Sequence, residues 1–75
     1  MPKLQAIIAK ALKIDSQQVS DDLAMAGTPA WDSMKHMEIV VGIEEAYGIQ
    51  FEFEEIAEMG SVGAIRKILS GKDLV

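Results

Sequence analysis

The first fourteen residues carry apolar side chains at helical spacing, i, i+3, i+4, i+7 and i+8, and therefore predict an amphipathic helix over 1–14. Pro2 suits the first turn of this helix, where a backbone N–H is not needed. Lys10 and Lys13 are expected in its last turn, where they complement the helix dipole. The apolar face consists of Leu4, Ile7, Ile8, Ala11 and Leu12.

Residues 15–32 break this pattern and predict a long connecting loop. The segment is rich in Ser, Asp and Gln, and it closes on the turn-forming run Gly27-Thr28-Pro29. Its three larger apolar residues are expected to hold it against the core: Val19, Leu23 and Met25. Loops of this length in compact domains are often functional.

Three further helices are predicted after the loop. One runs from Ser33 to Tyr47 and stops at Gly48, a second is short and spans about 53–58, and the third starts after a Ser61 cap and ends at Gly71. The alternation in 49–53 hints at a strand, but that strand would have no partner. The pattern therefore predicts an all-α fold, a single domain over 1–75. It is a small four-helix bundle of three longer helices and one short helix, with a long loop between helices 1 and 2.

The helix over 33–47 has two apolar stripes on opposite sides when it is drawn at 100° per residue. The core stripe comprises Ile39, Val40, Ile43 and Tyr47, with Ala46 beside it. The second stripe comprises Met34, Met37 and Val41, and three acids flank it: Glu38, Glu44 and Glu45. A small bundle buries one broad face, so the second stripe is either a docking surface for partners or is covered by the 15–32 loop. Adaptable methionines and steering acids favour docking.

The amino-acid composition and net charge exclude several classes of function for this chain. Acidic residues outnumber basic ones 12 to 7 in a 75-residue chain, giving a net charge of −5, which disfavours nucleic acid as a partner and suits basic protein surfaces. No cysteine is present, so neither a disulfide framework nor a thiolate metal site is expected. The chain has no calcium-loop motif, no signal peptide and no membrane span, so we expect a soluble cytoplasmic protein without a metal and without membrane insertion.

The run "WDSMKHME", residues 31–38, holds Asp32, Ser33 and His36 close together and raises the question of a hydrolytic site. Asp32 directly precedes Ser33 and is badly placed to orient the imidazole, and neither a G-x-S-x-G elbow nor an oxyanion donor set is present. His36 is expected to be a partly packed helix residue. Asp32 is expected to cap the helix, whose free N–H groups and positive dipole end would favour a phosphate attached to Ser33.

At this point the residues resemble the acyl carrier proteins. The match begins at "DSM", residues 32–34, continues through "MEIVVGIEEAYGIQF", which is similar to the acidic recognition helix of that family, and ends in "EEIAEMGSVGAIRKIL". It covers nearly the whole chain. The resemblance implies that Ser33 carries a 4′-phosphopantetheine arm taken from coenzyme A by a separate phosphopantetheinyl transferase, with Asp32 beside it. The arm holds acyl groups as thioesters, and the chain itself, a monomer, has no catalytic residue.

The resemblance also assigns a partner face to this chain. Met34, Met37, Glu38, Val41, Glu44 and Glu45 would contact acyl-loading and acyl-transferring enzymes through basic docking patches on those enzymes. The chain departs from the usual pattern of that family at Trp31, at Lys35, in residues 27–29, which lead to Ser33, and in "FEFEE", which lacks a proline. These departures indicate a specialised carrier for fatty-acid, polyketide or other acyl biosynthesis. Two alternatives stay open: an unmodified helical adaptor docking through Met34, Met37 and Val41, and a small serine hydrolase.

Overall fold

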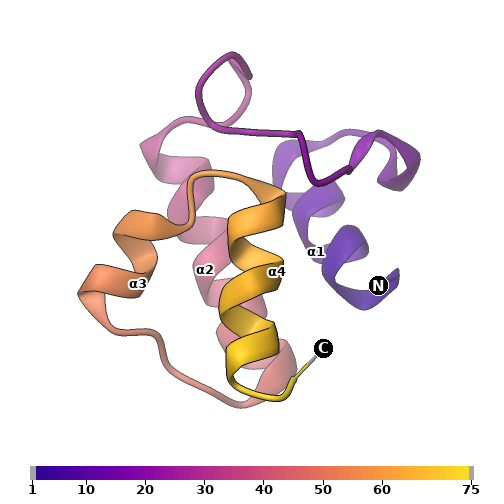
Figure 1. Ribbon diagram of the computed structural model, residues 1–75. Coiled ribbons are helices and arrows are strands. Elements are labelled where there is room, and N and C mark those ends of the chain that lie inside the picture. The colour runs from indigo at the N-terminus through magenta and orange to yellow at the C-terminus, as the bar shows by residue number, and fades with distance from the viewer. Residues whose placement is uncertain (1, 75) are drawn as a thin grey trace.

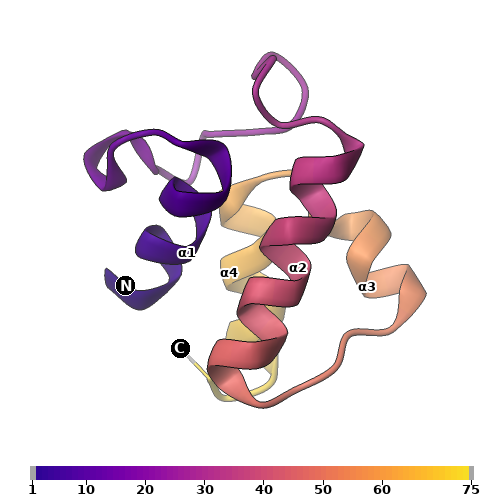
Figure 2. The same cartoon turned by 180° about the vertical axis from the view of Figure 1, so that it is seen from behind.

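Four α-helices and one 3-10 turn make up the fold of the computed structural model, which describes residues 2–74 (Figure 1). The helices are α1 (Pro2–Leu12), α2 (Ser33–Tyr47), α3 (Phe53–Glu58) and α4 (Val62–Gly71), and the turn is η1 (Ser16–Gln18). Seen from behind, α2 runs down the middle with α1 and α3 on either side and α4 beyond it (Figure 2). Extended pairing among the described residues is limited to an isolated bridge between Ala24 and Ser61. The all-α, four-helix prediction is confirmed; residues 1 and 75 lie outside the described part.

The core is built from the apolar faces that the spacing predicted, with aromatic and loop residues added. Leu4 and Ile8 of α1, Ile39 and Ile43 of α2, and Ile65 of α4 are all completely buried. Burying a side chain of this size contributes roughly 1.5–3 kcal/mol, so these few positions carry much of the favourable free energy of folding. The remaining buried residues are Ala9, Ala11, Leu12, Val19, Trp31, Val40, Phe51, Met59, Val62 and Leu69.

The end of α1 differs from the sequence prediction, whereas the end of α4 agrees with it. The first helix stops at Leu12, and Lys13 adopts the left-handed conformation with φ 59°, so Lys13 does not belong to the last turn. The amide of Ile14 then donates to the carbonyl of Ala9 at 3.0 Å, which closes the helix end. Helix α4 ends at Gly71, as the sequence predicted, and the left-handed residue beyond it is Asp73, with φ 61°. After both helices, a residue other than glycine occupies the left-handed position.

The stop signal at the end of α2 is confirmed. Gly48 adopts φ 67°, a conformation that costs glycine nothing, and its amide donates to the carbonyl of Glu44. The predicted hint of a strand over 49–53 is not realised. Instead, the amide of Phe51 donates to Oε2 of Glu44 at 2.9 Å, and the Phe51 ring lies under the Lys72 ammonium at 5.9 Å.

The long connection between α1 and α2 is held against the junction of α3 and α4. Met25 N donates to Gly60 O at 2.8 Å, Val62 N to Leu23 O at 2.9 Å and Gly63 N to Asp21 O at 3.1 Å. Arg66 of α4 pairs with the Asp21 carboxylate. Val19 is buried, whereas Leu23 and Met25 pack partly buried against the core. The loop prediction holds, with the addition of η1, and the anchoring leaves this segment away from the exposed face of α2.

Candidate functional site

The N-terminus of α2 presents Ser33 to solvent. Asp32 is extended, with φ −93° and ψ −175°, and its Oδ1 accepts a hydrogen bond from the amide of Lys35 at 2.9 Å. This is the capping arrangement that the sequence predicted. The amides of Ser33 and Met34 lie in the first turn, where a helix supplies no acceptor for them. Within residues 2–74 the Ser33 hydroxyl has no hydrogen-bond partner, so an exposed, unengaged nucleophile stands at the positive end of the helix dipole.

Trp31 and His36 fix the approach to this helix end. The indole Nε1 of Trp31 donates to Nδ1 of His36 at 3.1 Å, and the two rings stack with their centroids 6.1 Å apart. Because Nδ1 is the acceptor, the imidazole is neutral with its hydrogen on Nε2, and that N–H donates to the carbonyl of Ile56 in α3 at 2.9 Å. Trp31 is 2% exposed, so it packs inside the bundle. The pair connects the residues beside Ser33 to α3.

The same contacts remove His36 as a catalytic base. One ring nitrogen receives the indole N–H and the other donates to a backbone carbonyl, so neither can take a proton from Ser33. His36 is the partly packed helix residue that the sequence predicted. No group of three potential metal-ligating side chains occurs within residues 2–74, and in that part of the chain no helix is long and apolar enough to cross a bilayer.

The second apolar stripe of α2 is exposed, as its position opposite the core predicted. Met34 is 72% exposed, Met37 47% and Val41 46%, while Ile39, Val40 and Ile43 on the other side are buried. The alternative in which the 15–32 loop covers this stripe is excluded, because all three stripe residues are exposed and residues 21–25 of the loop are bonded to the α3–α4 junction instead. The stripe is therefore an apolar surface that the chain itself does not cover.

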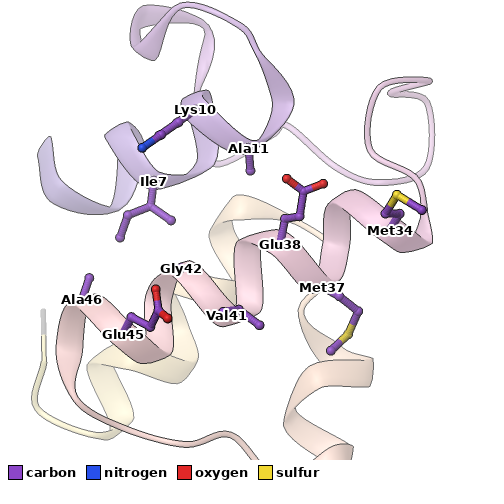
Figure 3. A pocket seen from close by; sticks show the side chains of 10 residues that line it. All are labelled: Ile7, Lys10, Ala11, Met34, Met37, Glu38, Val41, Gly42, Glu45 and Ala46. Carbon is purple, nitrogen blue, oxygen red and sulfur yellow. The ribbon is translucent and has the colours of Figure 1, made fainter.

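A groove of about 890 Å³ runs between α1 and α2 along this stripe (Figure 3). Gly42 lies in its floor, where an added Cβ would come within 3.0 Å of Cγ2 of Ile7, so the absence of a side chain lets the two helices approach. Ala46, which the sequence placed beside the core stripe, is exposed and lines the groove instead. The lining residues are Ile7, Lys10 and Ala11 from α1 and Met34, Met37, Glu38, Val41, Gly42, Glu45 and Ala46 from α2.

Five of the six predicted partner-face residues lie together in this groove, and Glu44 does not. Glu44 is half-buried and accepts the Phe51 amide, so its carboxylate serves the turn after α2 rather than the groove. The sequence alone did not identify Ile7, Lys10 and Ala11 as members of the same surface. Their i, i+3, i+4 spacing places them on one side of α1, but Ile7 and Ala11 had been assigned to the core and Lys10 to the helix end.

The comparisons with known proteins agree with this geometry. Residues 2–69 match the family model described as the phosphopantetheine attachment site. The chain is 27% identical over 71 residues to an acyl carrier protein of Helicobacter pylori (strain G27), covering 95% of this chain and 91% of that protein. It is 25% identical over 72 residues to an acyl carrier protein of Thermosynechococcus vestitus, covering 96% and 89%.

A solved structure is also similar. The solution structure of a holo acyl carrier protein from Geobacter metallireducens superimposes with a TM-score of 0.78 at 29% identity, covering 96% of this chain and 86% of that one. The chain therefore belongs to the phosphopantetheine attachment family of acyl carrier proteins. Its cofactor is covalently attached phosphopantetheine, and it is a carrier rather than a catalyst. Membership also implies interaction with a phosphopantetheinyl transferase and with acyl-handling enzymes.

Proposed function

We propose that Ser33 is the attachment point of the 4′-phosphopantetheine arm and that the arm presents acyl thioesters to partner enzymes. The observation that carries this proposal is the exposed, unbonded Ser33 hydroxyl in the first turn of α2. A phosphodiester there would meet the free amides of the first turn and the positive dipole end. When bound, the group supplies a terminal thiol for acyl transfer, while Asp32 keeps the helix end ordered through its bond to the Lys35 amide.

The experiment is intact-mass spectrometry after incubation with coenzyme A, Mg²⁺ and a broad-specificity phosphopantetheinyl transferase. We expect one arm mass on the wild-type chain and none on Ser33→Ala. Ser70→Ala is the matched control, because Ser70 is an exposed serine on α4 and its loss should leave the mass gain unchanged. An arm on Ser33→Ala, or no arm on the wild type, would refute the assignment of Ser33.

The partner face that we propose comprises Met34, Met37, Glu38, Val41 and Glu45, and its partners are acyl-loading and acyl-transferring enzymes. Exposed methionines adapt to partners of different shape. The departures at Trp31 and Lys35 support a specialised biosynthetic pathway rather than general fatty-acid synthesis. Lys35 pairs with Glu38 at 3.3 Å and offsets one acid of the face, while Trp31 is tied into the core.

The proposal includes a monomeric chain acting in the cytoplasm, where a coenzyme A-dependent transferase can reach it. Sedimentation at several protein concentrations tests the first part, and fractionation of cells expressing the tagged chain tests the second. A concentration-dependent dimer, or recovery outside the cytoplasmic fraction, would contradict the respective part.

The alternative of an unmodified adaptor, which the family's attached phosphopantetheine disfavours, would dock partners through Met34, Met37 and Val41 alone, and Met34 is 72% exposed. It predicts that Ser33→Ala leaves partner binding and cellular function intact, whereas Met37→Glu abolishes both. Phe53→Glu is the control, because Phe53 is 79% exposed at the start of α3 and lies outside the groove. Loss of function in Ser33→Ala would reject the adaptor.

A further inference from the structure

The groove between α1 and α2 has walls of opposite charge. Lys10 stands on the α1 wall and Glu45 on the α2 wall, both exposed, and neither has an ion-pair partner within residues 2–74. The other acid of the α2 wall, Glu38, is already paired with Lys35 at 3.3 Å. The acidic composition suggested a uniformly acidic surface, but the surface beside Ser33 carries charges of both signs. It offers one free anion and one free cation across an apolar floor (Figure 3).

The apolar floor is long enough for a helix of about three turns. From Met34 to Ala46 the α2 wall extends about 18 Å at 1.5 Å per residue, which matches about three turns of a helix lying alongside it. Ile7 and Ala11 point from α1 toward α2 in Figure 3, and Val41 lies below them. An amphipathic helix that inserts an apolar stripe into such a groove is a recurring mode of peptide recognition.

Two other occupants fit less well. Residues 21–25 of the long loop are bonded to the α3–α4 junction, and no residue of 15–32 lines the groove. A second copy related by a two-fold axis would have to insert a ridge of this same patch into the groove, and groove shifts that grow with protein concentration alone would reveal that dimer.

We propose that the groove accepts an amphipathic helix of a partner enzyme that carries a basic side chain facing Glu45 and an acidic side chain facing Lys10. This deepens the proposed function, on which it rests, by stating the chemistry of the partner. Lys10 then determines specificity from α1. It attracts a helix with charges of both signs and repels a helix that is basic on both flanks, so discrimination comes from repulsion as well as attraction.

The test uses two stapled helical peptides of about 14 residues, stapled because isolated helices of this length are marginal in water. Both share one apolar stripe; the first has a basic and an acidic flank, and the second is basic on both flanks. Each is titrated into the ¹⁵N-labelled full chain, loaded with its arm, and into the Ser33→Ala chain, which reads the groove without the arm. Lys10→Glu is the reversing variant. Lys67→Glu is its control, since Lys67 is an exposed lysine on α4 outside the groove.

We expect the mixed peptide to bind the wild type about two- to fivefold more tightly than the basic peptide, the size of effect that an exposed ion pair produces. Amides of Ile7, Lys10, Val41 and Gly42 should shift. In Lys10→Glu the order should reverse, and in Lys67→Glu it should stay. An unchanged order in Lys10→Glu, a reversal in Lys67→Glu, or no binding at millimolar peptide would overturn the proposal.

Three further outcomes would also overturn it. The peptide could shift only the amide of Phe53, outside the groove, or the groove amides could shift with protein concentration alone, which would indicate a second copy. An acyl chain on the arm could also shift the groove amides and prevent the peptide from binding. Failure of the proposed function is read separately, as the absence of an arm on the wild-type chain. The Ser33→Ala titration still reports on the groove in that case.

Discussion

The indole N–H of Trp31 donates to Nδ1 of His36 at 3.1 Å, and the other ring nitrogen of the same histidine bonds the Ile56 carbonyl of α3. Trp31 lies two residues before Ser33 and His36 three residues after it, so the bond spans the proposed attachment point. It fixes the direction from which the chain enters α2 and joins that entrance to α3. His36, which looked like part of a catalytic site, is structural, and with Trp31 it supports the helix end at which Ser33 is exposed.

Replacing His36 by Ala should lower the free energy of unfolding by about 1–3 kcal/mol, because the buried indole N–H would lose its acceptor. His36→Gln should lose less, since an amide can both accept from Trp31 and donate to Ile56 O. Urea unfolding followed by tryptophan fluorescence measures both, and Trp31 is the sole tryptophan in the sequence. Lys35→Ala serves as control, because the half-buried Lys35 side chain precedes His36 in the chain and takes no part in the Trp31–His36 bond. Equal stability of His36→Ala and the wild type would show that the bond contributes nothing.

Asp32→Ala should cost about 1 kcal/mol of stability, because the Lys35 amide loses its capping acceptor. Asp32→Asn keeps a side-chain oxygen at the same place and should stay close to the wild type. Chemical denaturation distinguishes the two, with Asp22→Ala in the exposed loop as control. If Asn were as damaging as Ala, the role of Asp32 would depend on its charge rather than on capping.

Lys13→Gly should stabilise the protein by about 0.5–1 kcal/mol. Lys13 holds φ 59° at the end of α1, a conformation that glycine adopts without the steric cost of a Cβ. The opposite sign is expected for Lys67→Gly inside α4, which should lose about 1 kcal/mol of helix propensity. Thermal and urea unfolding of the two variants provide the measurement, and a destabilised Lys13→Gly would contradict the assignment of strain to this residue.

The hydrogen bond from the Glu52 amide, and then Lys72 beside it, hold the pKa of Glu55 below its ordinary value. The ionised Glu55 carboxylate therefore contributes to stability above the pKa of an unfolded glutamate, about 4.3. This contribution is lost as pH falls through the lower pKa of Glu55 in the folded protein. Lys72→Met should raise the Glu55 pKa only in part, because the amide bond remains. Carboxyl ¹³C titration measures it, with Lys67→Met as control. Full return to the ordinary value would mean that the lysine, not the amide, is the main cause.

The sequence determined those features that depend on neighbours along the chain. Helical spacing located α1 through α4, local capping chemistry identified Asp32, Ser61 and Gly48, and a period of 3.6 residues placed Met34 and Met37 opposite the core. Helix positions, caps and the exposed face all depend on residues a few positions apart in the chain, so the local sequence is enough to predict them. The left-handed conformation of Lys13 and Asp73 was not predicted, because residues other than glycine seldom adopt it.

Only the tertiary structure decided what distant segments do to one another. The approach of α1 to α2 over Gly42 created the groove and brought Lys10 opposite Glu45. Packing against α3 gave His36 its acceptor at Ile56, and the turn after α2 engages the Glu44 carboxylate, which does not line the groove. Each of these features depends on how whole helices pack against one another. The periodicity of a sequence predicts which residues lie on the same face of a helix, but it does not predict which other element will pack against that face.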